Sequence, residues 1–370
     1  MKAIHPGGLQ LLIRLLAALA LVLQTTVAVN AAAAAPIGTA AAPTLTQLVG
    51  QKMVIRMDGT IPSASLLARV RRGEVGGIVL FGFNITTKSA LVAAMAKLQT
   101  AAADGGQPPL LIMVDQEGGT VKRIPWAGPT LSARQMGIDN SVSLTTQQGS
   151  SSAAALRSSG INVNLAPVAD VADSTASFMY QQQRTFGFSD TLVGRMALAF
   201  ADGTNSEAVI PTFKHFPGIG RATRNTDLYK VVISASRSTL NEDLYPFEHA
   251  MAAGGAPLLM LSNATYTAWD SANGAGWSKA MGAFLRNNLH YTGSTITDSL
   301  SGQPATYKLS LTVIAARACR AGTDMIMLTG TEASTANTFN SLLALAQSGS
   351  IPRSTLQTSY DRILALKSRF

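Results

Sequence analysis

Eight short apolar segments, each separated from the next by a longer helical pattern, constrain the fold of this chain more than any other feature. Stretches such as KSALVAAMAKLQTAAA and LVGRMALAFADGTNS have the composition of the intervening helices. Apolar strands that alternate with helices indicate a parallel sheet covered on both faces, and eight such units predict a single-domain α/β fold, a (β/α)8 TIM-like barrel. A doubly wound open sheet is the alternative, because periodicity does not distinguish the two. The eight segments are residues 53–56, 76–81, 109–115, 161–167, 209–216, 257–262, 294–298 and 324–328.

Ionisable residues stand at one end of several of these segments. Asp115 ends the third, and Asp298 ends the seventh. Lys214 and His215 lie near the end of the fifth. The C-terminal ends of barrel strands meet at one face, where active sites are built. An unpaired buried charge is costly, so chance placement does not account for the pattern, and we expect these four side chains to share one site.

The N-terminal segment has the pattern of a secretion signal. Lys2 and Arg14 precede the apolar run LLAALALVL, and small residues near Ala31–Ala35 suit cleavage. The run is short for a membrane span, so a retained anchor is the less favoured alternative, and we expect a secreted or extracytoplasmic protein without stable membrane insertion. The predicted organisation is a signal peptide (1–35), a linker (36–46) and one catalytic barrel (47–370).

Composition excludes several other classes of protein. The chain has 370 residues, of which 47% are apolar, and this suits a large core. The formal net charge is +9, but the Lys and Arg residues are scattered along the chain apart from RVRR at Arg69–Arg72, so we expect no nucleic-acid partner. No metal-ligand or nucleotide-binding motif is present, and we expect no metal, no cofactor and a monomer. Cys319 is the only cysteine, which excludes an intrachain disulfide and predicts a buried helical thiol.

Several segments, in their order along the chain, resemble glycoside hydrolase family 3, specifically its bacterial β-N-acetylhexosaminidases, which remove terminal N-acetylglucosamine. VDQEGG and KHFPG occurring together are highly specific for that family. The resemblance spans the chain from about residue 47 to its end and implies a single-domain TIM-like barrel. The matching segments are GGIVLFGFNI (76–85), LLIMVDQEGGTVKRI (110–124), INVNLAPVADV (161–171), RTFGF (184–188), KHFPGIG (214–220), TDSLS (297–301), AGTDMIML (321–328) and YDRILALK (360–367).

The resemblance assigns roles to individual residues. Asp298 matches the nucleophile, a carboxylate that would attack the anomeric carbon and retain the stereochemistry. The alternative is a helix N-cap, which TDSLS would also suit. Glu117 would support the sugar-binding side chains, and Asp170 would support a loop. The residues that match the family's sugar-binding positions, with ion pairs at the barrel mouth as their alternative role, are Asp115, Arg123, Arg184, Lys214 and His215.

The segment KHFPGIGRATRNTD departs from the family. The family carries its acid/base histidine in this loop, with an aspartate two residues earlier. Counting from Lys214 without a gap places Asn225 at the aspartate position and Asp227 at the histidine position. A second histidine of the family's motif is replaced by Ile219. The departure puts the identity of the acid/base in question.

Three hypotheses about Asp227 follow. It replaces the histidine as acid/base, in which case an apolar site or a nearby negative charge must raise its pKa from about 3.9. Alternatively, the loop has lost the acid/base and leaves a slow enzyme, or the barrel binds sugar without turnover. We rank the hypotheses in that order. Arg221 and Arg224 count against the first, because cations near Asp227 would lower its pKa.

The function favoured by these observations is hydrolysis of a terminal β-linked sugar, N-acetylglucosamine from peptidoglycan or chitin-type fragments, with water as the cosubstrate. A silent carbohydrate- or wall-binding barrel is the alternative from another class. A glycosidase of changed specificity is a third hypothesis, because ATYTAWD and GAGWSK depart from the family's loops. Gly218 and Gly220 suit hinges of a loop that closes over the sugar.

Overall fold

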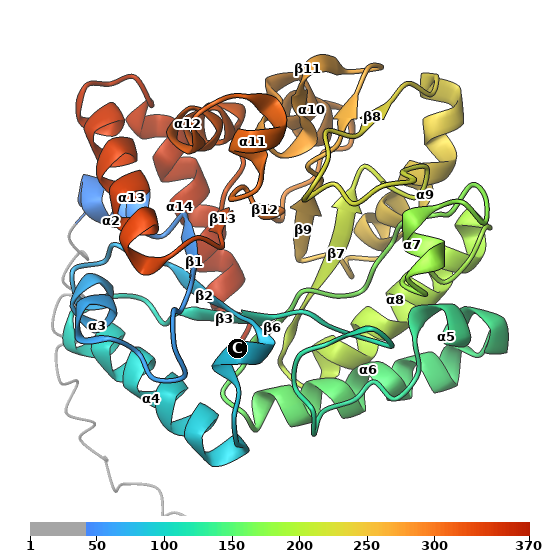
Figure 1. The fold of residues 1–370 in the computed structure, drawn as a ribbon, viewed down its shortest axis with the longest axis horizontal. Helices are drawn as coiled ribbons and strands as arrows, with labels where there is room; N and C mark the ends of the chain where they lie inside the picture. Colours follow the sequence, from blue (N-terminus) through green and yellow to red (C-terminus); the bar gives the residue numbers. More distant parts are fainter. Residues whose placement is uncertain (1–41) are drawn as a thin grey trace, which may run out of the picture. The chain divides into compact units, whose positions relative to one another are not determined.

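The computed structural model describes residues 42–370, so the predicted signal peptide and most of the predicted linker lie outside the described residues. Residues 43–370 form one compact unit, in which eight strands make one sheet in the order β12-β9-β7-β6-β3-β2-β1-β13 (Figure 1). Each predicted apolar segment contains one of them. The strands are β1 (Met53–Arg56), β2 (Gly77–Leu80), β3 (Leu111–Val114), β6 (Val163–Asn164), β7 (Ile210–Phe216), β9 (Leu258–Leu261), β12 (Ser294–Thr297) and β13 (Ile326–Leu328).

The sheet closes on itself. All neighbouring strands in the order pair in parallel. The two ends of the order meet where Ile296 and Met325 form a parallel bridge. There Met325 N donates to Thr295 O at 2.8 Å, and Thr297 N donates to Met325 O at 3.0 Å. The (β/α)8 barrel is therefore confirmed, and the open doubly wound sheet is excluded.

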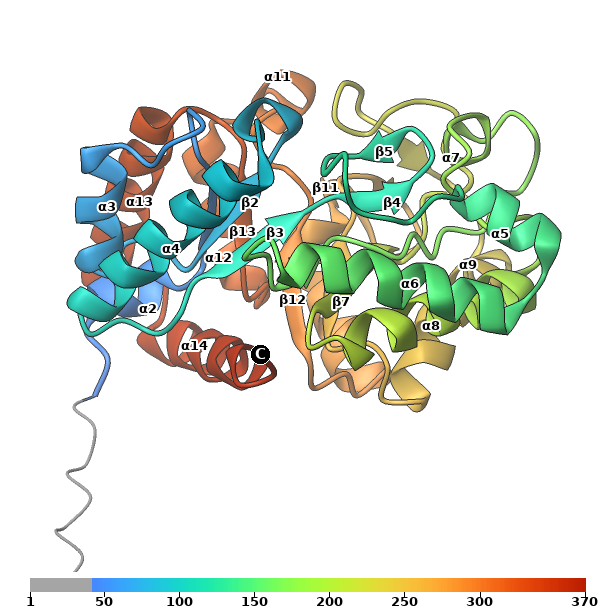
Figure 2. The ribbon, with the colours of Figure 1, turned by 90° about the horizontal axis from the view of Figure 1, so that it is seen from below.

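Helices surround the barrel, and α6 and α8 pack side by side (Figure 2). Many begin at a serine or threonine whose side-chain oxygen accepts a backbone N–H of the first turn, as Ser189 does for α8. No helix within residues 42–370 combines the length and apolarity that crossing a membrane requires. The main helices are α2 (Leu45–Gly50), α3 (Ala64–Arg71), α4 (Lys88–Asp104), α6 (Val142–Arg157), α8 (Asp190–Ser206), α9 (Arg237–Ala252), α10 (Lys279–Ala283), α12 (Leu311–Ala321), α13 (Glu332–Gln347) and α14 (Arg353–Lys367).

Shorter elements decorate the connections between strands. Some of these elements form two small sheets at the C-terminal side of the barrel strands. In one sheet β4 pairs with β5, and in the other β10 pairs with both β8 and β11. These sheets bring extra chain to the face where the site was expected. The shorter elements are η1 (Gly82–Asn84), β4 (Gln116–Gly118), β5 (Val121–Lys122), α5 (Ala133–Asp139), α7 (Phe178–Gln181), β8 (Val232–Ile233), β10 (Thr265–Tyr266), β11 (Asp270–Gly274), η2 (Ala275–Trp277), η3 (Phe284–Asn288) and α11 (Gln303–Tyr307).

The barrel strands alternate between two apolar layers. On β1, Val54 packs with the side chains that fill the barrel, while Met53 and Ile55 pack in the outer layer under the helices. This alternation follows from the two-residue period of a strand and makes the barrel interior a packed core. Cys319 is buried in α12 as predicted.

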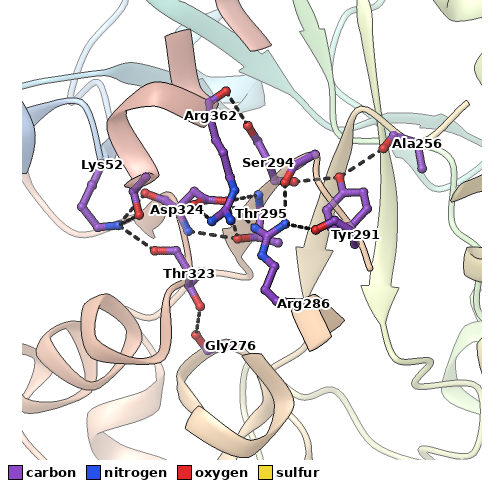
Figure 3. Close-up of polar contacts among 12 residues, drawn as sticks. Lys52, Ala256, Gly276, Arg286, Tyr291, Ser294, Thr295, Thr323, Asp324 and Arg362 are labelled. Carbon is purple, nitrogen blue, oxygen red and sulfur yellow. Dashed lines mark hydrogen bonds and ion pairs between the residues drawn. The ribbon is translucent and has the colours of Figure 1, made fainter. Parts of the chain in front are cut away.

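A charged cluster lies at the N-terminal ends of the strands (Figure 3). Asp324, which is fully buried, pairs with Arg286 at 2.7 Å and with Arg362 at 3.3 Å. The backbone N–H and the hydroxyl of Thr295 each donate to the same carboxylate at 2.9 Å. Lys52 Nζ donates to Asp324 O at 2.9 Å. The donors satisfy the buried carboxylate, so this cluster has a structural role, and the C-terminal ends of the strands are the place to look for a site.

Candidate active site

The residues expected to act on substrate converge on one pocket at the C-terminal ends of the strands. The pocket has a volume of about 230 Å³. All seven residues that the sequence singled out line it: Asp115, Arg123, Arg184, Lys214, His215, Asp227 and Asp298. Apolar and small polar side chains complete the wall, namely Phe81, Val121, Met179, Ile219, Met260, Met327, Asn225, Thr226, Ser299 and Thr329. The arrangement suits a small polar ligand.

The barrel itself positions the charged side chains. Asp115 follows β3 directly, and Asp298 follows β12 directly. Lys214 and His215 are the fifth and sixth residues of β7. Because the strands run in parallel, these positions meet at the same rim of the barrel. Loops beyond the strands bring the remaining charged residues to that rim.

A network of alternating charges forms one wall of the pocket. Lys214 Nζ lies 2.6 Å from Asp115 Oδ1 and 2.6 Å from Glu117 Oε1. Arg184 forms two hydrogen bonds with Glu117, at 2.8 and 2.9 Å. Burial alone would raise the pKa of Glu117, but Arg184 and Lys214 lower it to about 2. Glu117 therefore stays ionised and holds the two cations in place, while the Asp115 side chain, 19% exposed, remains accessible to a ligand.

A buried aspartate orients His215. Asp170 Oδ2 lies 2.8 Å from His215 Nδ1, and its Oδ1 accepts the backbone N–H of His215 at 3.1 Å. The same oxygen accepts the N–H of Ile219 at 2.7 Å. The contact between Nδ1 and the carboxylate fixes the orientation of the imidazole ring. Asp170 does not line the pocket and holds the turn, as expected from the sequence.

The environment of Asp298 excludes the N-cap alternative. Its Oδ1 accepts the N–H of the next residue, Ser299, at 2.7 Å, but α11 begins only at Gln303, with Gly302 as its N-cap. Asp298 is therefore held by a local turn at the strand end, with its carboxylate in the wall of the pocket.

Asp227 lies on the loop between β7 and β8, exposed at the rim of the same pocket. Desolvation of its carboxyl in the pocket, together with the negative charge of Asp298, raises its pKa to about 7. His215 and Arg184 oppose this shift. A carboxyl with this pKa is half protonated near neutrality. Asp298 lies beside Asp227 as the second carboxyl.

The arginines that were expected to lower the pKa of Asp227 are engaged elsewhere. Arg221 Nε pairs with Asp243 at 2.7 Å, and the guanidinium of Arg224 lies 4.7 Å from the centre of the Tyr229 ring. Both cations thus have partners other than Asp227, which sequence proximity did not predict.

Packing accounts for the two glycines that the sequence suggested as hinges. Gly218 has a φ of +121° and lies against Asp243, where a Cβ would come within 2.9 Å of that side chain. A Cβ on Gly220 would lie 1.7 Å from Val171 O. Both positions are tightly packed, and the need for close approach explains the glycines.

Two features of the pocket were not, or not fully, anticipated. Asn263, two residues beyond β9, contacts the loop that carries Asp227, and the strand-end pattern that identified the charged residues would have found it had amides been considered. Arg123 has a buried Nε without a hydrogen-bond partner within residues 42–370.

A barrel whose C-terminal rim carries two neighbouring carboxyls in different environments, surrounded by hydrogen-bond donors, has the arrangement of a glycoside-cleaving enzyme. No group of three or more His, Cys, Asp or Glu side chains in the part of the chain that the structure describes is placed to hold a metal ion. Residues 44–366 match the model of the glycosyl hydrolase family 3 N-terminal domain. The chain therefore belongs to glycosyl hydrolase family 3 and is a glycoside hydrolase.

Known proteins resemble this chain over most of its length. An uncharacterized secreted glycosyl hydrolase from Arthroderma benhamiae is 35% identical over 349 residues, which cover 92% of this chain and 97% of that protein. The crystal structure of a β-N-acetylhexosaminidase from Beutenbergia cavernae superposes with a TM-score of 0.81 at 30% identity, covering 89% of this chain and 99% of that one. A family 3 β-N-acetylglucosaminidase from a Paenibacillus species gives a TM-score of 0.83 at 29% identity over 89% of this chain. This chain spans 63% of that longer protein.

Proposed function

We propose that this protein is a retaining β-N-acetylhexosaminidase that releases terminal β-linked N-acetylglucosamine from glycan fragments. The observation that carries the proposal is the pairing of Asp298 with Asp227 in one pocket, with the pKa of Asp227 raised to about 7. Retaining glycosidases divide the chemistry between two carboxyls in this way, one ionised and one protonated. The similarity to a β-N-acetylhexosaminidase is the reason for proposing an N-acetylated sugar as the one released.

In the first step, the Asp298 carboxylate attacks the anomeric carbon while the bond to the leaving oxygen breaks. Asp227 donates its proton to that oxygen, so the leaving group departs as an alcohol. In the second step, the Asp227 carboxylate takes a proton from water, and the resulting hydroxide oxygen attacks the anomeric carbon. The ester to Asp298 breaks and the carboxylate is restored. Two inversions give net retention.

The remaining polar residues bind the sugar. Asp115 accepts from ring hydroxyls, since carboxylate oxygens accept hydrogen bonds from neighbouring hydroxyl groups. Arg123, Lys214 and Arg184 line the pocket and present cations to hydroxyl or acetamido oxygens. His215 offers a ring nitrogen. The pocket of about 230 Å³ is smaller than the ~300–1,000 Å³ typical of ligand sites, which favours a single terminal residue.

The state of Asp227 favours turnover over binding alone. A silent sugar-binding barrel has no use for a carboxyl that stays protonated near pH 7 beside a second carboxylate, and such a pair costs stability. We therefore place the silent barrel second. No contact in the pocket favours a changed sugar specificity.

Hydrolysis of 4-nitrophenyl β-N-acetylglucosaminide and of the matching β-glucoside tests the proposal. We expect turnover of the first substrate, with the β-anomer as the initial product by NMR. Asp298→Ala should abolish turnover, while Asp139→Ala, an exposed carboxyl on α5, should leave it unchanged. Binding of N-acetylglucosamine without hydrolysis, or an initial α-anomer, would overturn it.

We further propose that the protein acts outside the cytoplasm as a monomer. The N-terminal signal pattern supports export, and the secreted relative is consistent with it. Expression of the full chain in a secreting host should give an extracellular protein whose N-terminus, by mass spectrometry, starts between residues 32 and 36. Light scattering should give the mass of one chain. Recovery of the full chain in the cytoplasmic fraction, or a dimer mass, would contradict these expectations.

A further inference from the structure

The loop that carries Asp227 rests on the chain segment that follows Asp298. Gln303, which is fully buried, donates from Nε2 to Thr226 O at 3.2 Å. Thr226 is itself only 5% exposed, so this contact is enclosed. The backbone next to the candidate acid/base is therefore bound to the segment that starts with the candidate nucleophile.

A glycine permits the closest contact between the two segments. A Cβ on Gly302 would lie 2.5 Å from Asp227 O. The φ of Gly302 is −80°, a value that any residue adopts. The glycine is thus required by the approach of the loop and not by its own backbone conformation. An alanine at this position would press directly on Asp227.

Asn263 bridges the two segments through its side chain. Its Nδ2 donates to Ser299 O at 2.9 Å and lies 3.5 Å from Asp227 Oδ1. Asn263 is only 1% exposed, and Tyr307 donates from its hydroxyl to Asn263 O at 2.8 Å. Tyr307 thus holds the backbone of Asn263, and the bond to Ser299 O holds its side-chain Nδ2. An N–H donor that faces a carboxyl favours its ionised form and limits its movement.

The same loop is anchored at both of its ends. At its start, Tyr266 donates from its hydroxyl to Gly218 O at 2.8 Å. At its end, β8 pairs with β10, with Val232 opposite Thr265. Start, middle and end of the loop are thus all attached to the rim of the barrel. A loop held at three places along its length does not need to close before the chemistry can occur.

We infer that Asn263, Gly302 and Gln303 are positioning residues that hold Asp227 beside Asp298 in the resting enzyme, so the acid/base is in place before the substrate binds. The inference rests on the proposed function. It assigns these residues an effect on proton transfer to the leaving group and not on sugar binding. A reaction whose leaving group needs no proton should therefore be insensitive to them.

A leaving-group series tests this effect. The variants are Gln303→Ala, Asn263→Ala and Gly302→Ala, and the substrates are phenyl and 2,4-dinitrophenyl β-N-acetylglucosaminides. General acid catalysis contributes roughly 10²–10⁴-fold, so partial misplacement of Asp227 should lower kcat/KM for the phenyl substrate by about 10–100-fold. The dinitrophenyl substrate, whose leaving group needs little protonation, should change by less than about threefold.

Gln99→Ala serves as the matched control. Gln99 also bridges backbone groups through its amide, with Nε2 donating to Leu110 O at 3.0 Å, but it lies outside the pocket. Its loss should affect both substrates equally. Equal loss on both substrates in the Gln303 and Asn263 variants would overturn the inference, because it would reveal a purely structural role. Absence of turnover in the unaltered enzyme would instead refute the proposed function.

The pH profile gives a second readout for Asn263→Ala. The charged or titratable groups that act on Asp227 are Asp298, His215, Arg184 and Asp115, and all remain in this variant. Removing a donor to the ionised carboxyl should shift the alkaline limb of kcat/KM to higher pH, above its position near 7. An unchanged limb would contradict the assigned contact even if Gly302→Ala fails to fold.

Discussion

The strongest prediction concerns the proton on Asp227 at neutral pH. With a pKa of about 7, about half of the molecules carry this proton at pH 7. An unshifted aspartic acid with a pKa of 3.8 would carry it in only about one molecule in 1,000, because the difference is about three pH units. The pocket therefore increases the fraction of competent acid at pH 7 by nearly three orders of magnitude.

Replacing the carboxyl with an amide removes the acid and changes the shape little. We expect Asp227→Asn to lower kcat/KM for phenyl β-N-acetylglucosaminide at pH 5 by roughly 10²–10⁴-fold. The alkaline limb near pH 7 should also disappear, because the group that titrates there is gone. N-acetylglucosaminyl β-fluoride, whose leaving group needs no general acid, should be attacked by Asp298 almost as fast as before.

Stopped-flow and steady-state kinetics from pH 4 to 9 measure both effects. Azide supplies an independent check, since it attacks a glycosyl-enzyme without a base and should restore turnover as glycosyl azide in this variant. A wild-type profile without a limb between pH 6 and 8 would refute the reasoning. So would a variant that keeps full activity on the phenyl substrate at pH 5.

Three further predictions concern stability and binding. Asp324→Ala leaves its two partly exposed arginine partners without their buried counter-charge, so we expect a loss of about 3 kcal/mol in the free energy of unfolding by urea denaturation, with a smaller loss for Asp324→Asn. Glu117→Gln removes the negative charge shared by Lys214 and Arg184. We expect a lower Tm in thermal unfolding and a higher KM in initial-rate measurements. An unchanged KM would show that this network does not contribute to sugar binding. The folded-state pKa of Asp227 lies above its unfolded value, so its contribution to stability is lost as pH rises from about 4 to about 7. The Tm of Asp227→Asn relative to wild type should therefore rise over that range and level off above it, and a constant difference would contradict the raised pKa.

The sequence predicted the barrel because eight apolar segments alternating with helices allow few other arrangements of the strands. It did not predict at which residue the backbone pairing of each strand would end. The fourth segment, expected at 161–167, forms a strand only at Val163–Asn164. Side-chain amides complete the pairing with β3: Asn162 Oδ1 accepts the N–H of Ile112 at 2.7 Å, and Asn164 Oδ1 accepts that of Gln116 at 3.1 Å. A side chain that replaces a backbone partner gives no signal in hydrophobic periodicity.

The strand-end pattern brought the charged residues of the site together correctly because strand ends are set by topology. It overlooked Asn263, since an amide carries no charge to mark it. It also misjudged Arg221, whose partner Asp243 comes from α9 and not from the loop. Distances between loops depend on tertiary packing, and the contact between Gly302 and Asp227 O follows from no local pattern.

A carboxyl in place of an imidazole changes how the acid/base is tuned. A histidine titrates near neutrality by itself, with a pKa of about 6.5, whereas Asp227 depends on its surroundings and on the charge of Asp298. That dependence suits the reaction. When Asp298 becomes an ester in the intermediate, its negative charge disappears, and the pKa of Asp227 should fall. Asp227 has then just given up its proton and must act as a base, so the ionised form that it needs is favoured. When the ester is hydrolysed, the charge returns, the pKa rises, and Asp227 retains the proton that it took from water. The proximity of the two carboxyls thus makes the covalent state of one set the protonation state of the other.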